Sequence, residues 1–256
     1  MVDWNPAQYL RFAAERSRPA QDLMERVAVA EPDGARLFDL GCGTGTGARA
    51  LKARWPKARV TGVDASAPML AEAKAGGGDV VWIEADLAAW RPDRPADLIY
   101  SNAALQWLPD HDRLFPSLVD GLKPGGILAI QMPLNHDAPS HRLMVDTADT
   151  GPWWRRFAAV PRQPPTRSAG AYYDLLAGRV RHLDLWETTY LHVLEGDNPV
   201  VEWVKGTGLR PWLEAAGESR DAFLARYAER IQLAYPKRAD GRTLFPFRRL
   251  FIVATR

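Results

Sequence analysis

An apolar run that is followed at once by four alternating glycines is the feature that most constrains the fold of this chain of 256 residues. The stretch LFDLGCGTGTGARAL spans residues 37–51. A buried strand, a tight glycine turn and an amphipathic helix, in that order, form the first part of a βαβ unit. Glycine adopts positive φ angles without strain and lets a ligand approach the backbone closely. The stretch therefore predicts a parallel sheet with a ligand-binding loop after its first strand.

The rest of the first half continues this alternation of short apolar runs and helical spacing. Strands are predicted at residues 36–40, 59–64, 79–86, 96–102 and 125–133, and helices at 47–56, 67–77 and 112–126. Continuous apolar strands that alternate with helices indicate a parallel sheet covered on both faces. The predicted fold class is α/β, with a Rossmann-like doubly wound sheet.

After residue 134 the spacing becomes mainly helical. Helices are predicted at 140–160, 169–180, 199–217 and 219–236, and strands at 183–194 and 245–256. Residues 1–30 predict two consecutive helices, with Pro6 and Pro19 at their first positions. We expect a single domain over residues 1–256, with these N-terminal helices at 1–30, a ligand-binding core at 36–134, and a helical cap with the final strands at 135–256.

Composition excludes several classes of protein. The formal net charge is +2 and no block of Lys and Arg stands out, which argues against a nucleic acid as partner. The single cysteine, Cys42, excludes an internal disulfide and a multi-cysteine zinc site, and no metal site is predicted. No apolar run is long enough to span a bilayer, and the first residues lack the apolar segment of a signal peptide. We therefore expect a soluble cytoplasmic protein that binds neither nucleic acid nor membrane; no oligomeric state is predicted.

The glycines alone are compatible with three kinds of turn. Gly43, Gly45 and Ala48 fit the G-x-G-x-x-A fingerprint of a dinucleotide site. Gly41, Gly43 and Gly45 equally allow the backbone to approach the amino acid and ribose of S-adenosylmethionine. A tight turn without any ligand is the third possibility. The residues around the loop decide between them.

Acidic residues at the ends of three successive strands favour a ligand without phosphate. A carboxylate at Asp39, close before the loop, would repel a pyrophosphate but could pair with an ammonium group. Asp64 is placed to accept hydrogen bonds from ribose hydroxyls, and Asp86 to accept one from an adenine amino group. No tyrosine has a lysine four positions later, as a short-chain dehydrogenase would require. These features indicate S-adenosylmethionine as the cofactor.

The motifs around these residues are similar to those of a known family. FDLGCGTGTGARAL, VTGVDASAPMLAEA, IEADL and ADLIYSNAALQWLPD resemble, in order and spacing, the motifs of class I S-adenosylmethionine-dependent methyltransferases over residues 36–133. DWNPAQYLRFAAERSRPAQDLM, EWVKGTGLRPWL and LFPFRRLFIVATR resemble one subgroup, the trans-aconitate 2-methyltransferases. The resemblance implies an enzyme that methylates a carboxylate of a small polycarboxylate, with trans-aconitate as the first candidate, and so forms a monomethyl ester.

The resemblance also implies which residues hold the cofactor. They lie in the glycine loop, after the second and third strands, and at the end of the fourth: Asp39, Gly41, Cys42, Gly43, Asp64, Ala65, Met69, Asp86, Leu87 and Asn102. Met69 and Leu87 could sandwich an adenine ring, although both positions also suit a helix core. The helices at 1–30 would act as a lid over the site.

The implied reaction requires no catalytic acid or base. A carboxylic acid has a pKa of about 4 and is ionised at neutral pH, so the nucleophile is ready to react. Catalysis is expected from in-line positioning of carboxylate oxygen, methyl carbon and sulfur, which can contribute up to about 10 kcal/mol. No motif demands a general base, and His111 and His136 are predicted to be surface loop residues.

The carboxylates that are not methylated need cationic partners, most simply arginine forks. The segment KGTGLRP supplies Lys205 and Arg210 and a glycine turn whose backbone N–H groups could meet an anion, although a plain turn with a solvated arginine fits as well. Arg16 is favoured among the N-terminal arginines, and Gln106 and Trp107 are expected to border the substrate. Further candidates are Arg11, Arg18, Arg248 and Arg249.

Two other functions are also compatible with the sequence. One is a methyltransferase for an uncharged small molecule, which a buried apolar cap without converging arginines would favour. The other is a protein that binds S-adenosylmethionine and transfers nothing. DNA is not expected as the acceptor, because SNAAL lacks the Asp/Asn-Pro-Pro-aromatic motif that adenine methyltransferases carry after the fourth strand.

Overall fold

The computed structural model describes residues 13–162 and 166–256, and of residues 13–16 it describes the backbone alone. The described chain forms two compact units. We call them the sheet unit, which consists of residues 17–133, 166–188 and 249–256, and the helical unit, which consists of residues 134–162 and 189–248.

A sheet in the strand order β3-β2-β1-β4-β5-β7-β6 forms the centre of the fold. Its strands are β1 (Arg36–Leu40), β2 (Arg59–Asp64), β3 (Val81–Glu84), β4 (Ala96–Asn102), β5 (Leu122–Pro133), β6 (His182–Leu194) and β7 (Thr243–Thr255). β1 to β5 are parallel, and β7 is antiparallel to β5. The strand order changes direction between β1 and β4, which is where doubly wound sheets bind their ligands. The predicted α/β, Rossmann-like fold is confirmed.

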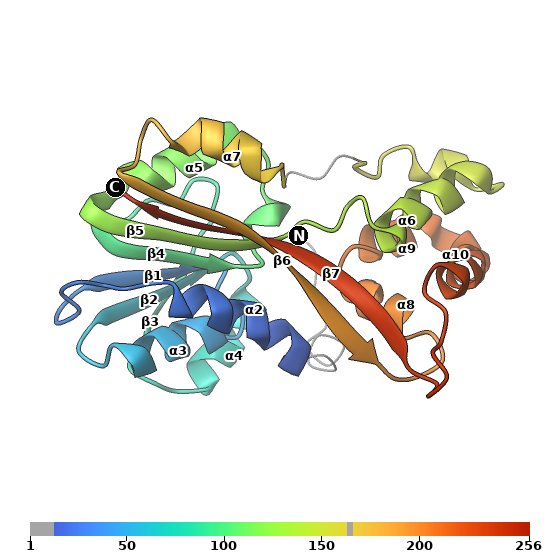
Figure 1. Ribbon diagram of the computed structural model, residues 1–256, viewed down its shortest axis with the longest axis horizontal. Coiled ribbons are helices and arrows are strands. Elements are labelled where there is room, and N and C mark those ends of the chain that lie inside the picture. Colours follow the sequence, from blue (N-terminus) through green and yellow to red (C-terminus); the bar gives the residue numbers. More distant parts are fainter. Residues whose placement is uncertain (1–12, 163–165) are drawn as a thin grey trace. The chain divides into compact units, whose positions relative to one another are not determined.

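Helices cover both faces of this sheet (Figure 1). α2 (Ala13–Glu25), α3 (Thr46–Arg54) and α4 (Ala67–Ala75) lie on one side, and α5 (His111–Asp120) and α7 (Ala169–Leu176) lie together on the other. Tyr100 in β4 anchors α2, because its hydroxyl group donates a hydrogen bond of 2.9 Å to the carbonyl of Ala20. Between α5 and α7, the ring centroids of Phe115 and Tyr172 lie 4.8 Å apart.

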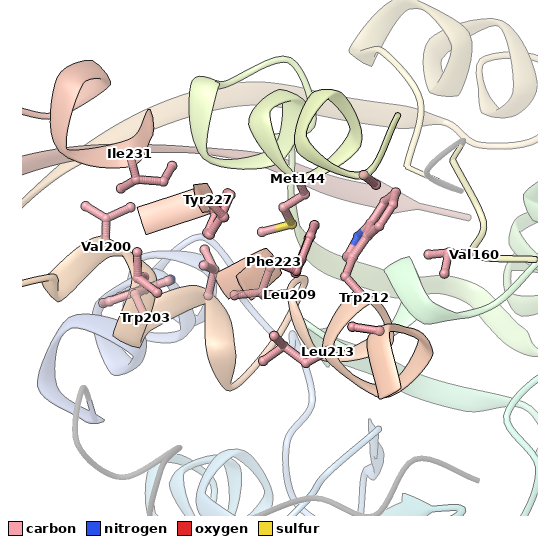
Figure 2. Close-up of a cluster of buried hydrophobic side chains, with 14 of the residues drawn as sticks. Met144, Val160, Val200, Trp203, Leu209, Trp212, Leu213, Phe223, Tyr227 and Ile231 are labelled. Carbon is pink, nitrogen blue, oxygen red and sulfur yellow. The ribbon is translucent and has the colours of Figure 1, made fainter. Parts of the chain in front are cut away.

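The helical unit has its own hydrophobic core. Its helices are α6 (Pro139–Thr150), α8 (Pro199–Lys205), α9 (Arg210–Ala216) and α10 (Arg220–Ala234), with 3-10 turns at Trp154–Phe157 and Gly217–Ser219. Figure 2 shows side chains from these helices meeting around Met144, Phe223 and Tyr227. Trp203 and Trp212 are buried in the same core. Buried aromatic side chains such as these stabilise a core through the large apolar area that they remove from water.

Several predicted boundaries differ from the structure. Pro19 is predicted to open a helix but lies inside α2, where burial of its ring offsets the hydrogen bond that proline cannot donate. The helix predicted at 112–126 ends at Asp120, because Leu122 already pairs with Ala96 as the first residue of β5. The strand predicted at 79–86 is limited to the four residues of β3, and the helix predicted at 199–217 is divided into α8 and α9.

The grouping of elements along the chain also differs within residues 135–256, where α7 and parts of β6 and β7 belong to the sheet unit. α7 belongs to the sheet unit, although its residues are predicted to lie in the cap, because Tyr172 packs against α5. Residues 1–12, which include the predicted helix start at Pro6, lie outside the described residues. Within the described ranges, no helix combines the length and the apolar composition needed to span a bilayer. The division into a lid, a core and a cap stays a prediction.

Candidate functional site

The glycine loop joins the end of β1 to the start of α3 and is bonded to the end of β2. The backbone N–H groups of Gly41 and Cys42 both donate to the carbonyl of Val63, at 2.8 and 3.2 Å. One carboxylate oxygen of Asp64 accepts a hydrogen bond of 2.8 Å from the N–H of Gly43. These bonds hold the loop over the carboxyl ends of β1 and β2.

Gly41 and Gly43 are two of the three loop glycines with positive φ angles, and they face different surroundings. Gly41 has a φ of +72°, and a Cβ atom there would lie 2.1 Å from the Cβ atom of Ala104. Gly43 has a φ of +52°, and outside residues 42–44 no atom of the described residues lies within 4 Å of the place that its Cβ would take. The loop is therefore packed against protein at Gly41 and open at Gly43, where a ligand can lie against the backbone.

Asp39, near the end of β1, supports the loop from within. Its side chain is 3% exposed, and a Cβ atom on Gly47 would lie 2.6 Å from its Oδ2. Burial raises the pKa of this carboxyl to about 7; a hydrogen bond from the backbone of Ala48 lowers that pKa, and the charge of Asp64 raises it. The Asp39 carboxyl thus faces the first turn of α3, and its contact with an ammonium group stays a prediction.

Asp64 ends β2 and connects the segments around it. Its second carboxylate oxygen accepts a hydrogen bond of 2.9 Å from the N–H of Ser66. Its backbone carbonyl accepts one of 3.0 Å from Ala85, directly after β3. Ser66 caps α4 and thereby fixes the first turn, which contains Met69. Each carboxylate oxygen keeps a lone pair for a further donor, so hydroxyl groups can still bind to Asp64.

After β3 the chain returns to the glycine loop. Asp86 is exposed and accepts a hydrogen bond of 3.0 Å from the N–H of Ala88, so it begins a turn and does not end a strand. Leu87 is buried, and its Cδ1 lies 3.5 Å from the place of a Cβ atom on Gly41. Leu87 therefore forms an apolar wall beside the loop, while Asp86 is accessible from solvent.

The segment after β4 carries two amide side chains whose oxygen atoms lack a donor. Gln106 lies in the 3-10 turn Leu105–Trp107, and its Nε2 donates to the carbonyl of Ala103 at 2.6 Å. Oδ1 of Asn102 and Oε1 of Gln106 are buried and have no hydrogen-bond partner among the described residues. Trp107 is 48% exposed. Because buried polar atoms are nearly always bonded, these oxygens indicate a ligand that donates hydrogen bonds.

The structure thus brings the strand-end candidates of the sheet unit to one place. Asp64 bonds to Gly43, and Leu87 and Ala104 both adjoin Gly41. This place is the switch point of strand order between β1 and β4. No group of three or more His, Cys, Asp or Glu side chains suited to a metal ion is present in the described part of the chain.

A family model described as a methyltransferase domain matches residues 12–217. This chain belongs to the methyltransferase family. Over its full length the methyltransferase is similar to a trans-aconitate 2-methyltransferase from Azoarcus sp. strain BH72, at 53% identity over 257 residues that cover 100% of both chains. It is also similar to a trans-aconitate 2-methyltransferase from Escherichia coli O1:K1 / APEC, at 46% identity, with 100% of this chain and 99% of the relative covered.

Solved structures share the fold of the methyltransferase. The YcgJ protein of Bacillus subtilis superposes with a TM-score of 0.61 at 16% identity, over 93% of this chain and 98% of that one. An S-adenosylmethionine-dependent methyltransferase from Mesorhizobium loti superposes with a TM-score of 0.52 at 23% identity, over 94% of this chain and 98% of that one. Both agree with the doubly wound sheet described above.

The methyltransferase carries its predicted cationic substrate residues in the helical unit. Lys205, at the end of α8, forms an ion pair of 2.6 Å with Glu202. Arg210, at the start of α9, forms one of 2.8 Å with Glu214. Each cation has a carboxylate partner on its own helix, which a substrate carboxylate would have to replace or share. The side chain of Arg16 lies outside the described residues.

The glycine turn between α8 and α9 has few backbone donors left for an anion. The N–H groups of Thr207 and Leu209 donate to the carbonyl of Val204 at 3.0 and 2.9 Å. The N–H of Arg210 donates to the carbonyl of Thr207 at 3.2 Å. The turn therefore uses these N–H groups itself, and an anion here would depend on the side chains of Lys205 and Arg210.

The prediction that His111 is a surface loop residue is wrong. His111 is 1% exposed at the start of α5. Its Nδ1 lies 2.6 Å from the hydroxyl group of Tyr172, and its Nε2 lies 3.0 Å from the carbonyl of Leu105. Burial lowers the pKa of the imidazole. The cause is α7, which covers α5 at this point and gives the ring a partner far away in the sequence. His136 is half-buried.

One buried polar residue of the methyltransferase was not predicted. Gln131 lies near the carboxyl end of β5 and is fully buried. Its Oε1 accepts a hydrogen bond of 3.2 Å from Nη1 of Arg249, one of the secondary arginine candidates. The signal in the sequence was a single amide within the otherwise apolar stretch ILAIQMP.

Proposed function

We propose that this methyltransferase transfers a methyl group from S-adenosylmethionine to a carboxylate of a small polycarboxylate, with trans-aconitate as the acceptor and a monomethyl ester as the product. The observation that carries the proposal is similarity over the full length, at 46–53% identity, to relatives named trans-aconitate 2-methyltransferase. The similarity extends over the helical unit as well, whereas the motif of the glycine loop supports only a cofactor site in the sheet unit.

The cofactor is proposed to lie along the carboxyl ends of β1, β2 and β4. Asp64 would accept hydrogen bonds from the ribose hydroxyls, and the unmet oxygen of Asn102 would accept one from the ammonium group of the methionine part. Met69 and Leu87 would border the adenine. The remaining proposed contacts are Asp39, Gly41, Cys42, Gly43, Ala65 and Asp86. Carboxylates at this edge and an open Gly43 suit a cationic ligand without phosphate.

When bound, S-adenosylmethionine supplies an electrophilic methyl group. The residues of this chain have to hold the acceptor carboxylate in line with that group and to exclude water from it. A carboxylate of ordinary pKa is ionised at neutral pH, so no side chain has to take a proton. His111 accordingly needs no part in the reaction, since both of its ring nitrogens have partners within the protein. Rate enhancement then comes from alignment and desolvation.

The acceptor is proposed to meet Gln106 and Trp107 after β4, and the cations Lys205, Arg210 and Arg16. Gln106 has its amide nitrogen fixed by Ala103, and Trp107 offers an exposed ring. The cations would neutralise the carboxylates that are not methylated. A cytoplasmic location, and the lack of nucleic acid or membrane partners, stay predictions.

An assay of methyl transfer over a panel of acids tests this function. We expect turnover of trans-aconitate, weaker turnover of other di- and tricarboxylic acids, and a base-labile ester as the product. The trimethyl ester of trans-aconitate is the matched control, because it keeps the carbon skeleton but offers no carboxylate as nucleophile. Methylation restricted to uncharged acceptors, or binding of the cofactor without transfer to any acid, would contradict the proposal.

Asp64→Ala should weaken the binding of S-adenosylhomocysteine by about 1–3 kcal/mol, because hydrogen bonds to a charged group are lost. The same change removes the acceptor of the Gly43 N–H and so loosens the loop. Titration calorimetry measures the affinity. Asp79→Ala is the control, because Asp79 is an exposed carboxylate whose ion pair with Lys52 lies outside the proposed site. Equal affinities of the wild type and Asp64→Ala would rule out the ribose contact.

A further inference from the structure

A row of side chains crosses the sheet from β4 to β7 on one face. Asn102 pairs with Gln131 of β5, and Gln131 pairs with Phe251 of β7. Paired residues point to the same face, and so do residues two apart on one strand. Arg249, two residues before Phe251, therefore shares this face with Gln131, and the hydrogen bond between them agrees with that.

The face in question is the one that α2 covers. Tyr100, two residues before Asn102 on β4, bonds through its hydroxyl group to Ala20 of α2. Beside the row, the ring of Trp186 on β6 stacks on Phe251 with the ring centroids 4.6 Å apart. The polar pair of Gln131 and Arg249 thus has an apolar aromatic wall as its neighbour, which strengthens electrostatic interactions at this place.

The amide oxygen of Gln131 accepts a hydrogen bond, whereas its amide nitrogen lacks an acceptor among the described residues. A guanidinium group can only donate, so the oxygen of Gln131 must face Arg249 and the nitrogen must face away. Nε2 of Gln131 is buried and has no acceptor among the described residues. Leaving a buried donor without an acceptor is costly, so the position indicates an acceptor group that arrives with a ligand.

We infer that Gln131 and Arg249 bind one carboxylate of the acceptor molecule and thereby select for polycarboxylates. The inference rests on the proposed function and adds the site that recognises a carboxylate which is not methylated. Arg249 is 4% exposed and keeps its positive charge, and Gln131 presents an N–H donor beside it. A carboxylate oxygen would accept the N–H of Gln131 and lie beside the positive charge of Arg249.

A carboxylate could come from the acceptor or from the methionine part of the cofactor. The strand order favours the acceptor. β7 is the third strand from β1, and at about 4.8 Å per strand this places Arg249 about 14 Å across the sheet from the strand that carries the glycine loop. Asn102, which offers an oxygen, lies on the strand next to β1, whereas Gln131 and Arg249, which offer donors, lie farther out.

The deciding variant is Gln131→Glu, which keeps the shape of the side chain. It replaces the unmet donor of Gln131 by an acceptor and turns a negative charge toward an incoming carboxylate. We expect the Kd of trans-aconitate, measured by calorimetry in the presence of S-adenosylhomocysteine, and the KM for trans-aconitate each to rise by about 10- to 100-fold. We expect the Kd of S-adenosylhomocysteine to stay within about twofold of the wild-type value. The reason is that Gln131 is not proposed to contact the cofactor, and residues without shared partners affect binding independently.

Two further variants make the result interpretable. Gln232→Glu makes the same chemical change at an exposed position of α10 and should leave both affinities unchanged. Arg249→Lys keeps the charge but loses the planar fork, and should raise the Kd of trans-aconitate even if Gln131→Glu does not fold.

Several outcomes would overturn the inference. One is a parallel loss of S-adenosylhomocysteine affinity, which would make the pair a cofactor site. Another is trans-aconitate binding that neither variant changes. If the wild type methylates trans-aconitate and the variants do so equally well, this inference alone fails. If the wild type binds and methylates no polycarboxylic acid, the proposed function fails first.

Discussion

Gly43→Ala is expected to weaken the binding of S-adenosylhomocysteine by about 10- to 100-fold while the free energy of unfolding falls by no more than about 1–2 kcal/mol. Outside residues 42–44, no atom of the described protein lies within 4 Å of the added methyl group, so it causes no clash with the rest of the described chain. The cost to the unbound protein is the left-handed backbone at φ +52°, about 1–2 kcal/mol for a residue with a Cβ atom. The methyl group would instead occupy space proposed for the ligand.

Gly41→Ala is the matched control for this prediction. The two glycines lie in one loop and both have positive φ angles, but a methyl group on Gly41 would lie 2.1 Å from Cβ of Ala104. Strain and overpacking together should reduce the free energy of unfolding by about 2–5 kcal/mol. Thermal unfolding and calorimetric titration of both variants separate the effects. A Gly43→Ala protein that binds normally, or that loses as much stability as Gly41→Ala, would contradict an open ligand side at Gly43.

Local patterns in the sequence were sufficient for the centre of the fold. The predicted bounds of β1, β2 and β4 agree with the structure, because a glycine follows the apolar run of β1 and a polar residue ends β2 and β4. The glycine loop and the position of Asp64 follow from the same runs. Where the prediction was wrong, a local signal was outweighed by packing. Pro19 is typical of a helix start, but its burial within α2 allows the helix to run through it.

Contacts between distant segments could not be predicted. The burial of His111 depends on Tyr172, which lies 61 residues later in the chain. The pairing of Gln131 with Arg249 joins residues 118 positions apart and requires that β7 insert antiparallel beside β5. A single apolar strand with one amide gives no sign of its neighbour. The sequence therefore predicts which strand ends carry the site, while the structure is needed for the side-chain partners.

Asp39→Asn is expected to change how stability depends on pH. The native carboxyl has a pKa of about 7, whereas the ordinary pKa of an aspartate side chain, which applies to the unfolded chain, is 3.8. Between these two pH values the native state holds a proton that the unfolded state has released. The free energy of unfolding of the wild type therefore falls as pH rises through this window, by up to about 1.4 kcal/mol per pH unit. An amide at this position does not titrate, and that contribution disappears.

The difference between the two proteins isolates this carboxyl from all other titrating groups. Urea unfolding at pH 5, 6, 7 and 8 measures the free energy of unfolding of both proteins. The value for Asp39→Asn should rise relative to that of the wild type at each step up to pH 7. The full difference produced by the titration is a few kcal/mol, about the product of three pKa units and 1.36 kcal/mol. A difference that is the same at every pH would show that the native carboxyl is ionised throughout.

A buried carboxyl that destabilises the unbound protein at neutral pH is consistent with use by a cationic ligand. Calorimetry in buffers of different ionisation enthalpy should therefore find protons released when S-adenosylmethionine binds the wild type near pH 6.5, and fewer released by Asp39→Asn, because a nearby positive charge lowers the pKa of Asp39.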